Sequence, residues 1–372
     1  AFLSGGVDSS AVVAMMSVIL KSNVKTFSIN FEGLNDYNEQ KFSELVSSLY
    51  NTEHYTFNLK TDLISVLPKI VWYFDEPFAV SSAIGIYYLA KLAKEKITVA
   101  LTGDGADELF AGYPFRYSMD NRYKKISKIP KIMRNIFFRA LRLLPLLGNE
   151  SQRNFVQKVK NYSKFFNGSQ DDAFFNTYTF FDESIKRSLY TFNFSNGLYF
   201  EPSINVIKHY YNKINITDPI KRRLYGDIKT TLVDEMLTKV DKMSMAWSLE
   251  SRVPFLDHEL VEFVFNIPSK YKLQNREGKI ILKKMLEKYL PNEILYRKKH
   301  GFNVPMDKWF RFELYDYLND ILSENTIKKR GIFNYEIIKK MIELHKNYKA
   351  NYAGELNILL NFELWYREYI GS

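Results

Sequence analysis

The chain contains no cysteine among its 372 residues. This absence excludes disulfide bonds, thiolate metal sites and cysteine nucleophiles together, and it fits a reducing compartment, so we expect a cytoplasmic protein. Long apolar runs are missing too, because no stretch approaches the roughly 18 residues that a membrane helix needs. With 46% hydrophobic and 16% aromatic residues, the composition predicts instead a globular protein with a large buried core.

Acidic residues are scarce in one segment of the chain. The formal net charge is +10, and residues 115–166 hold 13 Lys and Arg but only two acids, Asp120 and Glu150, so the remaining residues are close to neutral. The segment lacks the aromatic and basic motifs of RNA-binding modules, and we therefore expect no nucleic-acid partner. A solvated helical face is the simplest interpretation, with docking to a membrane surface or a protein partner as the alternative.

The glycine-rich loop at residues 4–10, Ser-Gly-Gly-Val-Asp-Ser-Ser, lacks the lysine of a Walker-type loop, which disfavours a kinase or a GTPase. Its glycines let the backbone approach an anion, its hydroxyls and N–H groups donate to that anion, and a helix beginning near Ser9 directs its positive end there. Asp8 beside phosphate groups implies a bridging Mg²⁺. The sequence therefore predicts a phosphate-binding loop, and a turn that only caps the helix is the alternative.

Strand and helix patterns alternate through the first hundred residues. Period-two patterns predict strands at 25–31, 53–59 and 97–101, and helical spacing predicts helices over 62–72 and 84–94. This alternation indicates an α/β fold with a doubly wound parallel sheet, in which ligands bind at the carboxyl ends of the strands. The apolar residues before the first loop resemble the end of a buried strand, so we expect the sequence to be a piece of a longer chain.

Beyond residue 115 the strand signals stop and helical patterns predominate. We expect a nucleotide-binding core over 1–115, a basic and aromatic helical insertion over 116–225, and a helical part over 226–372 that completes the active site. Within the last part, the apolar spacing of 227–249 predicts a single helix. Its inward residues are expected to be Leu232, Met236, Val240, Met243 and Trp247.

A second glycine-containing loop, Thr102–Tyr113, directly follows a predicted strand and carries Asp104, Asp107 and Glu108 within five residues. Carboxylates this crowded repel one another unless a cation or a reacting proton lies between them. The loop therefore predicts metal binding or acid–base chemistry. The alternative is an acidic surface turn in which Asp107 or Glu108 caps the next helix.

Two later motifs carry charge near apolar residues. Arg252, in the segment 250–257, is expected either to bind a carboxylate in a bidentate manner or to form a buried salt bridge. Lys279 opens a helix after a glycine and either reaches an anion or is solvated. That helix is expected to bury Leu282, Met285, Leu286 and Leu290, and the following turn, with Arg297, Lys299, Gly301, Phe302, Pro305 and Trp309, is interpreted as structural.

These segments together resemble the synthetase half of the glutamine-hydrolysing asparagine synthetases, which belong to the ATP pyrophosphatases. The resemblance rests on Ser-Gly-Gly-Val-Asp-Ser-Ser, Gly-Asp-Gly-Ala-Asp-Glu-Leu-Phe-Ala-Gly-Tyr, Asp-Lys-Met-Ser-Met-Ala, Glu-Ser-Arg-Val-Pro-Phe-Leu-Asp, Gly-Lys and Lys-His-Gly-Phe-Asn-Val-Pro, which occur in the family's order. It extends from residue 1 to about residue 310. One departure is Thr102, which stands where the family usually has serine.

The resemblance implies an ATP site in the two glycine-containing loops. Ile29 would meet the adenine, with Thr102 and Gly103 beside the nucleoside. Asp107 would join Asp8 at the Mg²⁺ ion. The pyrophosphate of ATP would be held by Ser4, Gly5, Gly6, Asp8, Ser9 and Ser10.

The same resemblance implies the catalytic residues. Asp104 takes a place that is often glutamate in the family, and it would assist as the substrate is adenylylated and as ammonia attacks. Lys279 would stabilise the charge that develops on the departing pyrophosphate. Substrate contacts are expected from Glu250, Arg252 and Tyr113.

The implied reaction converts aspartate to asparagine through β-aspartyl-AMP and releases AMP and pyrophosphate. In this family ammonia comes from a glutaminase whose nucleophile is an amino-terminal cysteine, which this sequence lacks. We therefore expect either a glutaminase on a longer chain or the use of free ammonia. Small molecules are the expected partners, and a homodimer is left open.

Three other functions remain as alternatives at this point. A related amidotransferase would act on a sugar acid or a peptide, or would close a β-lactam ring. A tRNA-modifying ATP pyrophosphatase would explain the basic segment, although no RNA-module signal accompanies it. A non-catalytic scaffold is disfavoured because every loop residue that would touch phosphate is present.

Overall fold

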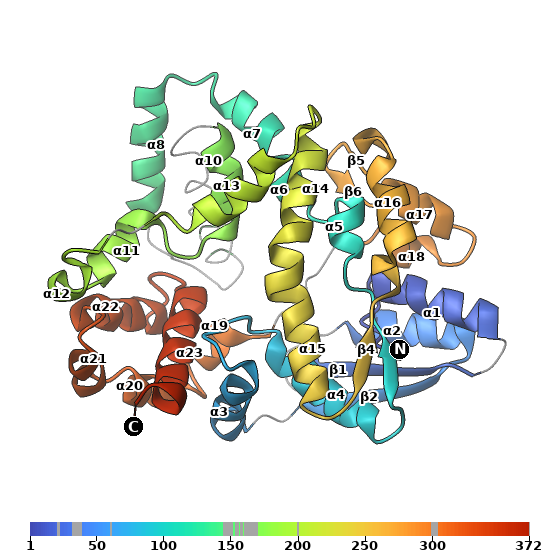
Figure 1. Cartoon of the computed structure of the whole chain (residues 1–372), viewed down its shortest axis with the longest axis horizontal. Helices are drawn as coiled ribbons and strands as arrows, with labels where there is room; N and C mark the ends of the chain where they lie inside the picture. The colour runs from blue at the N-terminus through green and yellow to red at the C-terminus, as the bar shows by residue number, and fades with distance from the viewer. Residues whose placement is uncertain are drawn as a thin grey trace. The chain divides into compact units, whose positions relative to one another are not determined.

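The computed structural model describes residues 1–20, 23–31, 39–59, 62–143, 152, 156, 159, 170–198, 201–298 and 304–371. The chain forms two compact units that are discontinuous in sequence (Figure 1). The first unit comprises Ala1–Glu76, Val80–Pro114 and Tyr210–Pro305. The second comprises Pro77–Ala79, Phe115–His209 and Met306–Ser372, whereas the expected segments 1–115, 116–225 and 226–372 are each continuous.

Parallel strands lie at the centre of the first unit. Strands β1 (Lys25–Phe31) and β2 (Glu53–Leu59) pair in parallel over their full length, with the bounds that the sequence predicts. Phe2 bridges to β1 in parallel, and its N–H donates to Leu101 of β3 (Val99–Leu101) at 3.0 Å. Strand β3 pairs in parallel with β4 (Glu250–Arg252). Hydrogen bonds thus connect β2, β1, residues 1–3, β3 and β4 in that order.

Residues on both sides of this sheet are buried. Ala1 and Leu3 belong to one apolar cluster with residues of helix α1 (Val7–Leu20), whereas Phe2 belongs to another with residues of α4 (Ala83–Lys94). Neighbouring side chains of a strand point to opposite faces. The two clusters therefore cover opposite faces of the strands, and the first loop emerges at the edge where residues 1–3 end.

Helices surround the strands of the first unit. Helix α1 packs beside α2 (Gln40–Tyr50), and α4 packs on β1 and on α15 (Thr238–Met245) (Figure 1). Helix α3 (Leu63–Phe74) begins after Asp62, whose carboxylate accepts the Ser65 N–H. The other elements are α5 (Ala106–Phe110), α14 (Pro219–Lys229), η3 (Thr231–Leu237), η4 (Pro254–Leu256), α16 (His258–Asn266), η5 (Ser269–Tyr271), β5 (Leu273–Gln274), β6 (Glu277–Gly278), α17 (Ile280–Leu286) and α18 (Asn292–Leu295).

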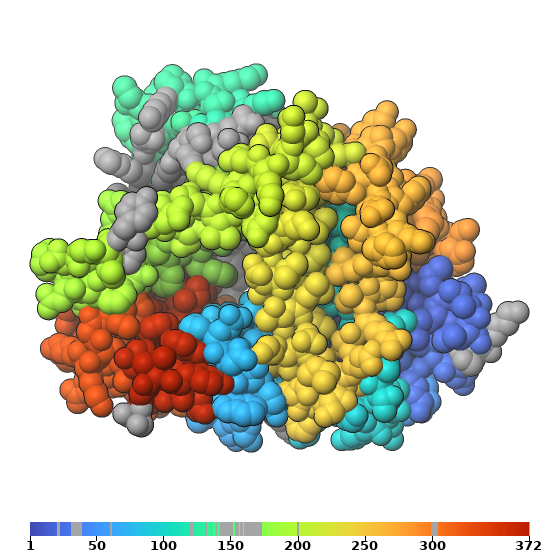
Figure 2. All heavy atoms as spheres, viewed as in Figure 1, coloured from blue at the N-terminus to red at the C-terminus, as the bar shows by residue number. Residues whose placement is uncertain are grey.

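The predicted single helix over 227–249 is irregular, so that prediction is wrong in detail. Helix α14 ends at Lys229, Thr230 has φ −128° and ψ −87°, and the π-helix η3 then leads into α15. The Thr230 hydroxyl donates to the Gly226 carbonyl at 2.8 Å, which satisfies a backbone group at the break. One side of the segment 227–249 lies on the surface, as the yellow atoms in Figure 2 show. Of the residues expected inward, Leu232, Val240 and Met243 are buried, and Met236 and Trp247 are half-buried.

The described part of the second unit is mainly helical. Helix α23 (Ala353–Tyr369) packs against α19 (Met306–Trp309), α20 (Tyr315–Ile321) and α22 (Tyr335–Lys346). Helices α6 (Pro114–Tyr117) and α13 (Ile204–Lys213) each contain a boundary between the units. The remaining elements are α7 (Met119–Ile126), α8 (Lys131–Leu143), α10 (Gln170–Phe175), η2 (Asn176–Tyr178), α11 (Glu183–Leu189), α12 (Phe192–Ser195) and α21 (Glu324–Arg330).

The architecture is therefore a mostly helical α/β fold with parallel strands. Among the described helices, none has the length and apolar character needed to cross a membrane. In the basic segment, Ile132, Met133, Ile136 and Phe137 of α8 are exposed, while Arg134 and Phe138 are buried. Residues 144–151 of that segment, and most of 153–166, lie outside the described residues.

Candidate active site

The first loop folds into a compact turn at the start of α1. The Ser4 N–H donates to Ser9 Oγ at 3.2 Å, the Gly6 N–H donates to Ser4 Oγ at 3.2 Å, and Ser9 Oγ donates to the Gly6 carbonyl at 3.2 Å. Ser10 is buried, and its hydroxyl has no hydrogen-bond partner among the described residues. The loop thus gathers hydroxyl and N–H groups at the positive end of a 14-residue helix.

The second loop is in direct contact with the first. A Cβ placed on Gly103 would lie 2.8 Å from Asp8 Cβ and 2.8 Å from the Ser9 backbone nitrogen. Such separations are shorter than van der Waals contact allows, so glycine is required where the two loops meet. Thr102 beside it is 2% exposed, and its hydroxyl has no hydrogen-bond partner among the described residues. The hydroxyls of Ser10 and Thr102 are therefore two buried polar groups that lack a hydrogen-bond partner among the described residues.

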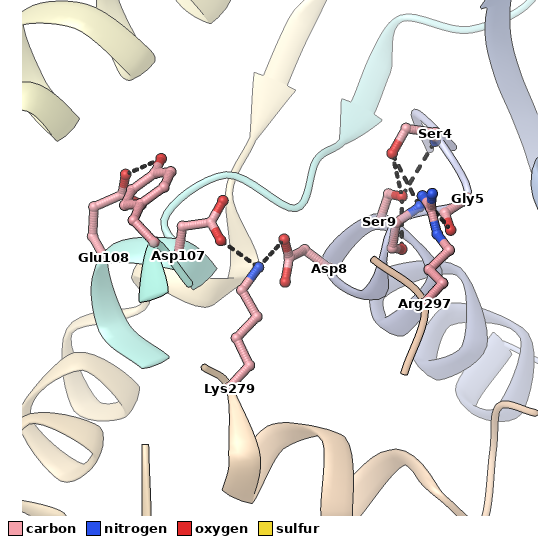
Figure 3. Close-up of polar contacts among 10 residues, drawn as sticks. Ser4, Gly5, Asp8, Ser9, Asp107, Glu108, Lys279 and Arg297 are labelled. Carbon is pink, nitrogen blue, oxygen red and sulfur yellow. Dashed lines mark hydrogen bonds and ion pairs between the residues drawn. The ribbon is translucent and has the colours of Figure 1, made fainter. Parts of the chain in front are cut away.

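A buried lysine connects the two loops (Figure 3). Lys279 Nζ lies 2.5 Å from Asp8 Oδ2 and 2.5 Å from Asp107 Oδ1. The residue follows β6 with a left-handed φ of 60°, and its N–H donates to the Phe110 carbonyl at 2.8 Å, which fixes its position. Burial opposes the charge on Lys279, but the carboxylates of Asp107 and Asp8 outweigh it and raise the lysine pKa above its ordinary value. Lys279 is therefore a permanent cation between two carboxylates.

Glu108 is a buried carboxyl group of the second loop, to which the family resemblance assigned no role. It is 1% exposed, and the Tyr113 hydroxyl donates to its Oε1 at 2.8 Å (Figure 3). Burial raises the Glu108 pKa to about 7, the charge of Asp107 adds to this rise, and the bond from Tyr113 opposes it. A carboxyl group that titrates near neutrality beside the paired charges is a candidate for proton chemistry.

The structure brings most of the predicted nucleotide residues to one place. The loop 4–10, Gly103, Asp107 and Lys279 lie in contact through the distances above. Ile29 is buried within β1, opposite Phe57 of β2. Asp104 is half-buried in the second loop. Their expected roles toward ATP and substrate stay predictions, because the contacts show placement and not ligand binding.

Glu250 and Arg252 pair with each other on the surface of the first unit. Arg252 Nε lies 2.6 Å from Glu250 Oε1, and the two side chains are 64% and 53% exposed. The interpretation of Arg252 as part of a buried salt bridge is therefore wrong, because the pair lies two residues apart on β4 and faces solvent. The Arg252 carbonyl accepts the Thr102 N–H at 2.9 Å. Its backbone, and not its charge, supports the second loop.

The helix after Lys279 and the turn beyond it give a mixed result. In α17 and just after it, Leu282, Leu286 and Leu290 are buried as predicted, but Met285 is 47% exposed, so its predicted inward position is wrong. Trp309 is buried in the second unit. Lys299, Gly301 and Phe302 lie outside the described residues.

Arg297 contacts the first loop, which its interpretation as part of a structural turn did not anticipate. Its Nη2 donates to the Gly5 carbonyl at 3.2 Å (Figure 3). The same guanidinium group pairs with Glu39. No sequence signal marked this contact, because 292 positions separate Arg297 from Gly5.

The donor set at this centre fits a magnesium ion that arrives with a phosphate ligand. Among the described residues there is no group of three or more His, Asp or Glu that would hold a metal unaided. Asp8 and Asp107 nevertheless converge on one cationic atom, Lys279 Nζ. Mg²⁺ is commonly bound by one or two carboxylates together with substrate phosphates. Two convergent carboxylates beside a phosphate-type loop meet that requirement.

Comparison with known proteins shows the family to which the chain belongs. A model of the asparagine synthase family matches residues 1–367. The chain belongs to the asparagine synthase family. Glutamine-hydrolyzing asparagine synthetase 1 of Bacillus subtilis (strain 168) is 32% identical over 98% of this chain and 55% of its own length. Glutamine-hydrolyzing asparagine synthetase 3 of the same organism is 26% identical over 95% of this chain and 53% of its own length.

A less similar relative carries another name. Amidase chyE of Penicillium rubens is 23% identical over 92% of this chain and 54% of its own length. The chain thus spans about half the length of these curated relatives. Membership of the asparagine synthase family is therefore shown, while the acceptor substrate is a separate question.

Proposed function

We propose that the protein catalyses ATP-dependent amidation of aspartate to asparagine through β-aspartyl-AMP, with release of AMP and pyrophosphate. The observation that carries the proposal is the buried centre of Asp8, Lys279 and Asp107 against the glycine-rich loop. Membership of the asparagine synthase family and 32% identity to an asparagine synthetase support it.

In the proposed site, Ser4, Gly5, Gly6, Ser9 and Ser10 bind the pyrophosphate of ATP, and Ile29, Thr102 and Gly103 surround the nucleoside. The clusters on opposite faces of the strands support a doubly wound sheet, whose carboxyl edge is where such a ligand binds. Asp8 and Asp107 would hold Mg²⁺, which supplies charge neutralisation to the phosphates.

The chain's own residues account for the remaining chemistry. Carboxylate oxygen is a poor leaving group, so activation as an acyl-adenylate precedes attack by ammonia. Lys279 stays charged and stabilises the negative charge on the departing pyrophosphate, as a preorganised group in a buried site. Asp104 assists adenylylation and the attack of ammonia, while Glu250, Arg252 and Tyr113 remain the candidates for contacting the acceptor. Water must be kept from the adenylate, or it hydrolyses.

A panel of acceptor acids tests this function. Release of pyrophosphate and AMP is measured with MgATP, ammonium and each of aspartate, glutamate, a sugar acid and a carboxyl-terminal peptide. We expect aspartate to give release well above buffer, and Asp8→Asn to abolish it without unfolding the protein. Release no greater with aspartate than with buffer would contradict the proposed substrate.

A second candidate is amidation of a different carboxylate. The relative named Amidase chyE aligns with 92% of this chain and does not carry the name asparagine synthetase, so a different acceptor is worth testing. Activation by adenylylation would be shared, so the same panel separates the two: release with another acid and none with aspartate would support this candidate.

We further propose a cytoplasmic enzyme of small molecules that takes its ammonia from a glutaminase, as the names of its relatives indicate for those proteins. Because this sequence has no cysteine, glutamine should not replace ammonium when this chain is assayed by itself. A homodimer is the assembly to test by sedimentation, and no binding to nucleic acid is expected.

A further inference from the structure

Arg297 makes three different contacts, one with the first loop and two with residues at the start of α2. Its Nη2 donates to the Gly5 carbonyl at 3.2 Å, its guanidinium pairs with Glu39, and the guanidinium carbon lies 4.3 Å from the centre of the Phe42 ring. The Arg297 and Glu39 side chains are only 11% and 18% exposed. A stacked, paired and largely buried guanidinium has little freedom to move, so its donor to Gly5 is fixed in place.

The partners of Arg297 are themselves fixed against the loop. A Cβ placed on Gly5 would lie 2.5 Å from Phe42 Cβ and 2.7 Å from the Ser43 backbone nitrogen. Gly5 has a φ of 74°, in the left-handed region that glycine adopts without strain. The start of α2 therefore packs directly on the loop, and Arg297 contacts both.

The contact with Gly5 sets the direction of one peptide unit. The Gly5 carbonyl and the Gly6 N–H belong to the same planar trans peptide, so they point in opposite directions. Arg297 donates a hydrogen bond to the Gly5 carbonyl, and the Gly6 N–H donates to Ser4 Oγ at 3.2 Å. An anion-binding turn needs its N–H groups directed at the ligand and its carbonyls directed away from it.

We propose that Arg297 is a positioning residue for pyrophosphate binding, which acts through the Gly5–Gly6 peptide. Without its guanidinium the carbonyl of Gly5 loses its partner, and the peptide is free to rotate so that an oxygen faces the phosphate. This inference rests on the proposed function, since it assumes that the loop binds the pyrophosphate of ATP. It gives Glu39 a supporting role, because that carboxylate orients the guanidinium.

Binding of Mg-pyrophosphate, measured by calorimetry on the whole chain, tests the inference. We expect Arg297→Ala to weaken binding at least about tenfold, the cost of a charge-assisted contact. Arg297→Lys keeps a donor but loses the planar fork, and Glu39→Gln keeps the fork but loses its ion pair, so both should fall between the alanine variant and the unmodified protein. In turnover assays, the KM for ATP should rise in the same order while the KM for the acceptor acid stays unchanged.

Arg330 provides a matched control in the second unit. It is also paired with a carboxylate, Glu363, at 3.1 Å, its side chain is 12% exposed, and its guanidinium carbon lies 4.2 Å from the centre of the Tyr366 ring. Arg330→Ala should lower thermal stability about as much as Arg297→Ala and leave pyrophosphate binding unchanged.

The outcomes separate this inference from the proposed function. Suppose that the unmodified chain binds pyrophosphate. If Arg297→Lys and Arg297→Ala then bind it as tightly as the unmodified chain does, the positioning role is overturned while the function stands. Equal weakening by Arg330→Ala would also overturn it, since the effect would then be one of general stability. If the unmodified chain does not bind pyrophosphate, both proposals fail.

Discussion

Two buried ionisable groups, one in each unit, are accommodated in opposite ways. In the second unit His345 is 1% exposed, the Tyr352 N–H donates to its Nδ1 at 3.2 Å, and its Nε2 lies 3.1 Å from the Asp307 carbonyl. These contacts suit a neutral imidazole with its proton on Nε2. Burial, with the nearby charge of Arg311, lowers the His345 pKa to about 4. In the first unit, Lys279 is buried as a cation between Asp8 and Asp107.

The comparison indicates that the buried Lys279 centre has a function beyond packing, whereas the buried His345 needs no such explanation. A neutral imidazole satisfied by backbone groups costs little once it is buried. A cluster of charges requires desolvation of every member, and replacing such a cluster by apolar residues is often neutral or stabilising in other proteins. Burial of the charged Lys279 centre therefore costs free energy of folding. Its position between the two glycine-containing loops indicates that the cluster serves the function of the site.

Removal of the Lys279 charge should have the largest effect. Lys279→Met leaves two carboxylates facing one another in a buried site, and we expect a loss of about 3–5 kcal/mol in the free energy of unfolding and a fall of about 100-fold or more in AMP formation. Chemical denaturation and a single-turnover assay measure the two losses.

Lys272 offers the control for this change. It is also fully buried, burial with the nearby charge of Lys221 lowers its pKa to about 8, and its Nζ has no hydrogen-bond partner among the described residues. Lys272→Met should therefore be neutral or stabilising. An equal loss in both variants would show that burial of a long side chain, and not the carboxylate pairing, is what matters.

The contact between the two loops should be the next most sensitive feature. Gly103→Ala forces a methyl group to within 2.8 Å of Asp8 and Ser9, and we expect a loss of about 1–3 kcal/mol in stability together with weaker ATP binding. Gly226 in α14 is the matched control, because a Cβ there meets no atom within 4 Å. Gly226→Ala should stabilise the protein by about 0.5–1 kcal/mol. A tolerated Gly103→Ala, with normal ATP binding, would contradict the tight loop contact.

The first loop, the second loop and strands β1 and β2 were all predicted from sequence. Both strands have seven residues with an alternating pattern, and their bounds agree with the structure. Strand β4 was not predicted, because three residues carry no usable period and its pairing with β3 is a tertiary contact. The acidic loop was predicted to bind a metal or to carry acid–base chemistry, and this stays a prediction. The sequence did not indicate that Asp107 of this loop pairs with Lys279.

Contacts between residues far apart in the chain are what the sequence could not specify. The partners of Lys279 and Arg297 depend on how separate segments pack, and no spacing rule connects residues almost 300 positions apart. The inward position of Glu108 was not specified either, because the residues that directly follow it in α5 point to other faces of the helix. The exposed position of Arg252 could not be predicted from sequence, because its burial depended on which strand β4 pairs with.

Glu108 should make stability fall as pH rises, which distinguishes the Lys279 centre from the His345 site. Its pKa is raised from 4.5 to about 7, so the folded state favours the protonated carboxyl. That stabilising contribution is present below pH 4.5 and is lost as pH rises through 7, by up to about 3 kcal/mol. Glu108→Gln keeps an acceptor for Tyr113 and removes the titration, so unfolding at pH 5 and pH 8 should show the variant gaining relative to the unmodified protein at pH 8. If the free energies of unfolding of the variant and the unmodified protein differed by the same amount at pH 5 and at pH 8, the raised pKa of Glu108 would be contradicted.

His345 should give the opposite pH dependence, with the smallest effect near neutrality. Its pKa is lowered from 6.5 to about 4, so the neutral form stabilises the fold above pH 6.5, and that stability is lost as pH falls through 4, again by up to about 3 kcal/mol. His345→Gln keeps a donor for the Asp307 carbonyl but cannot also accept the Tyr352 N–H, so at pH 7 it should cost about 1 kcal/mol. The deficit should shrink or reverse between pH 6 and pH 4, because glutamine does not titrate. Denaturant unfolding across that range measures it. Because the contributions of Glu108 and His345 change in opposite directions over the same acidic range, the double variant Glu108→Gln, His345→Gln should show a flatter profile than either single variant.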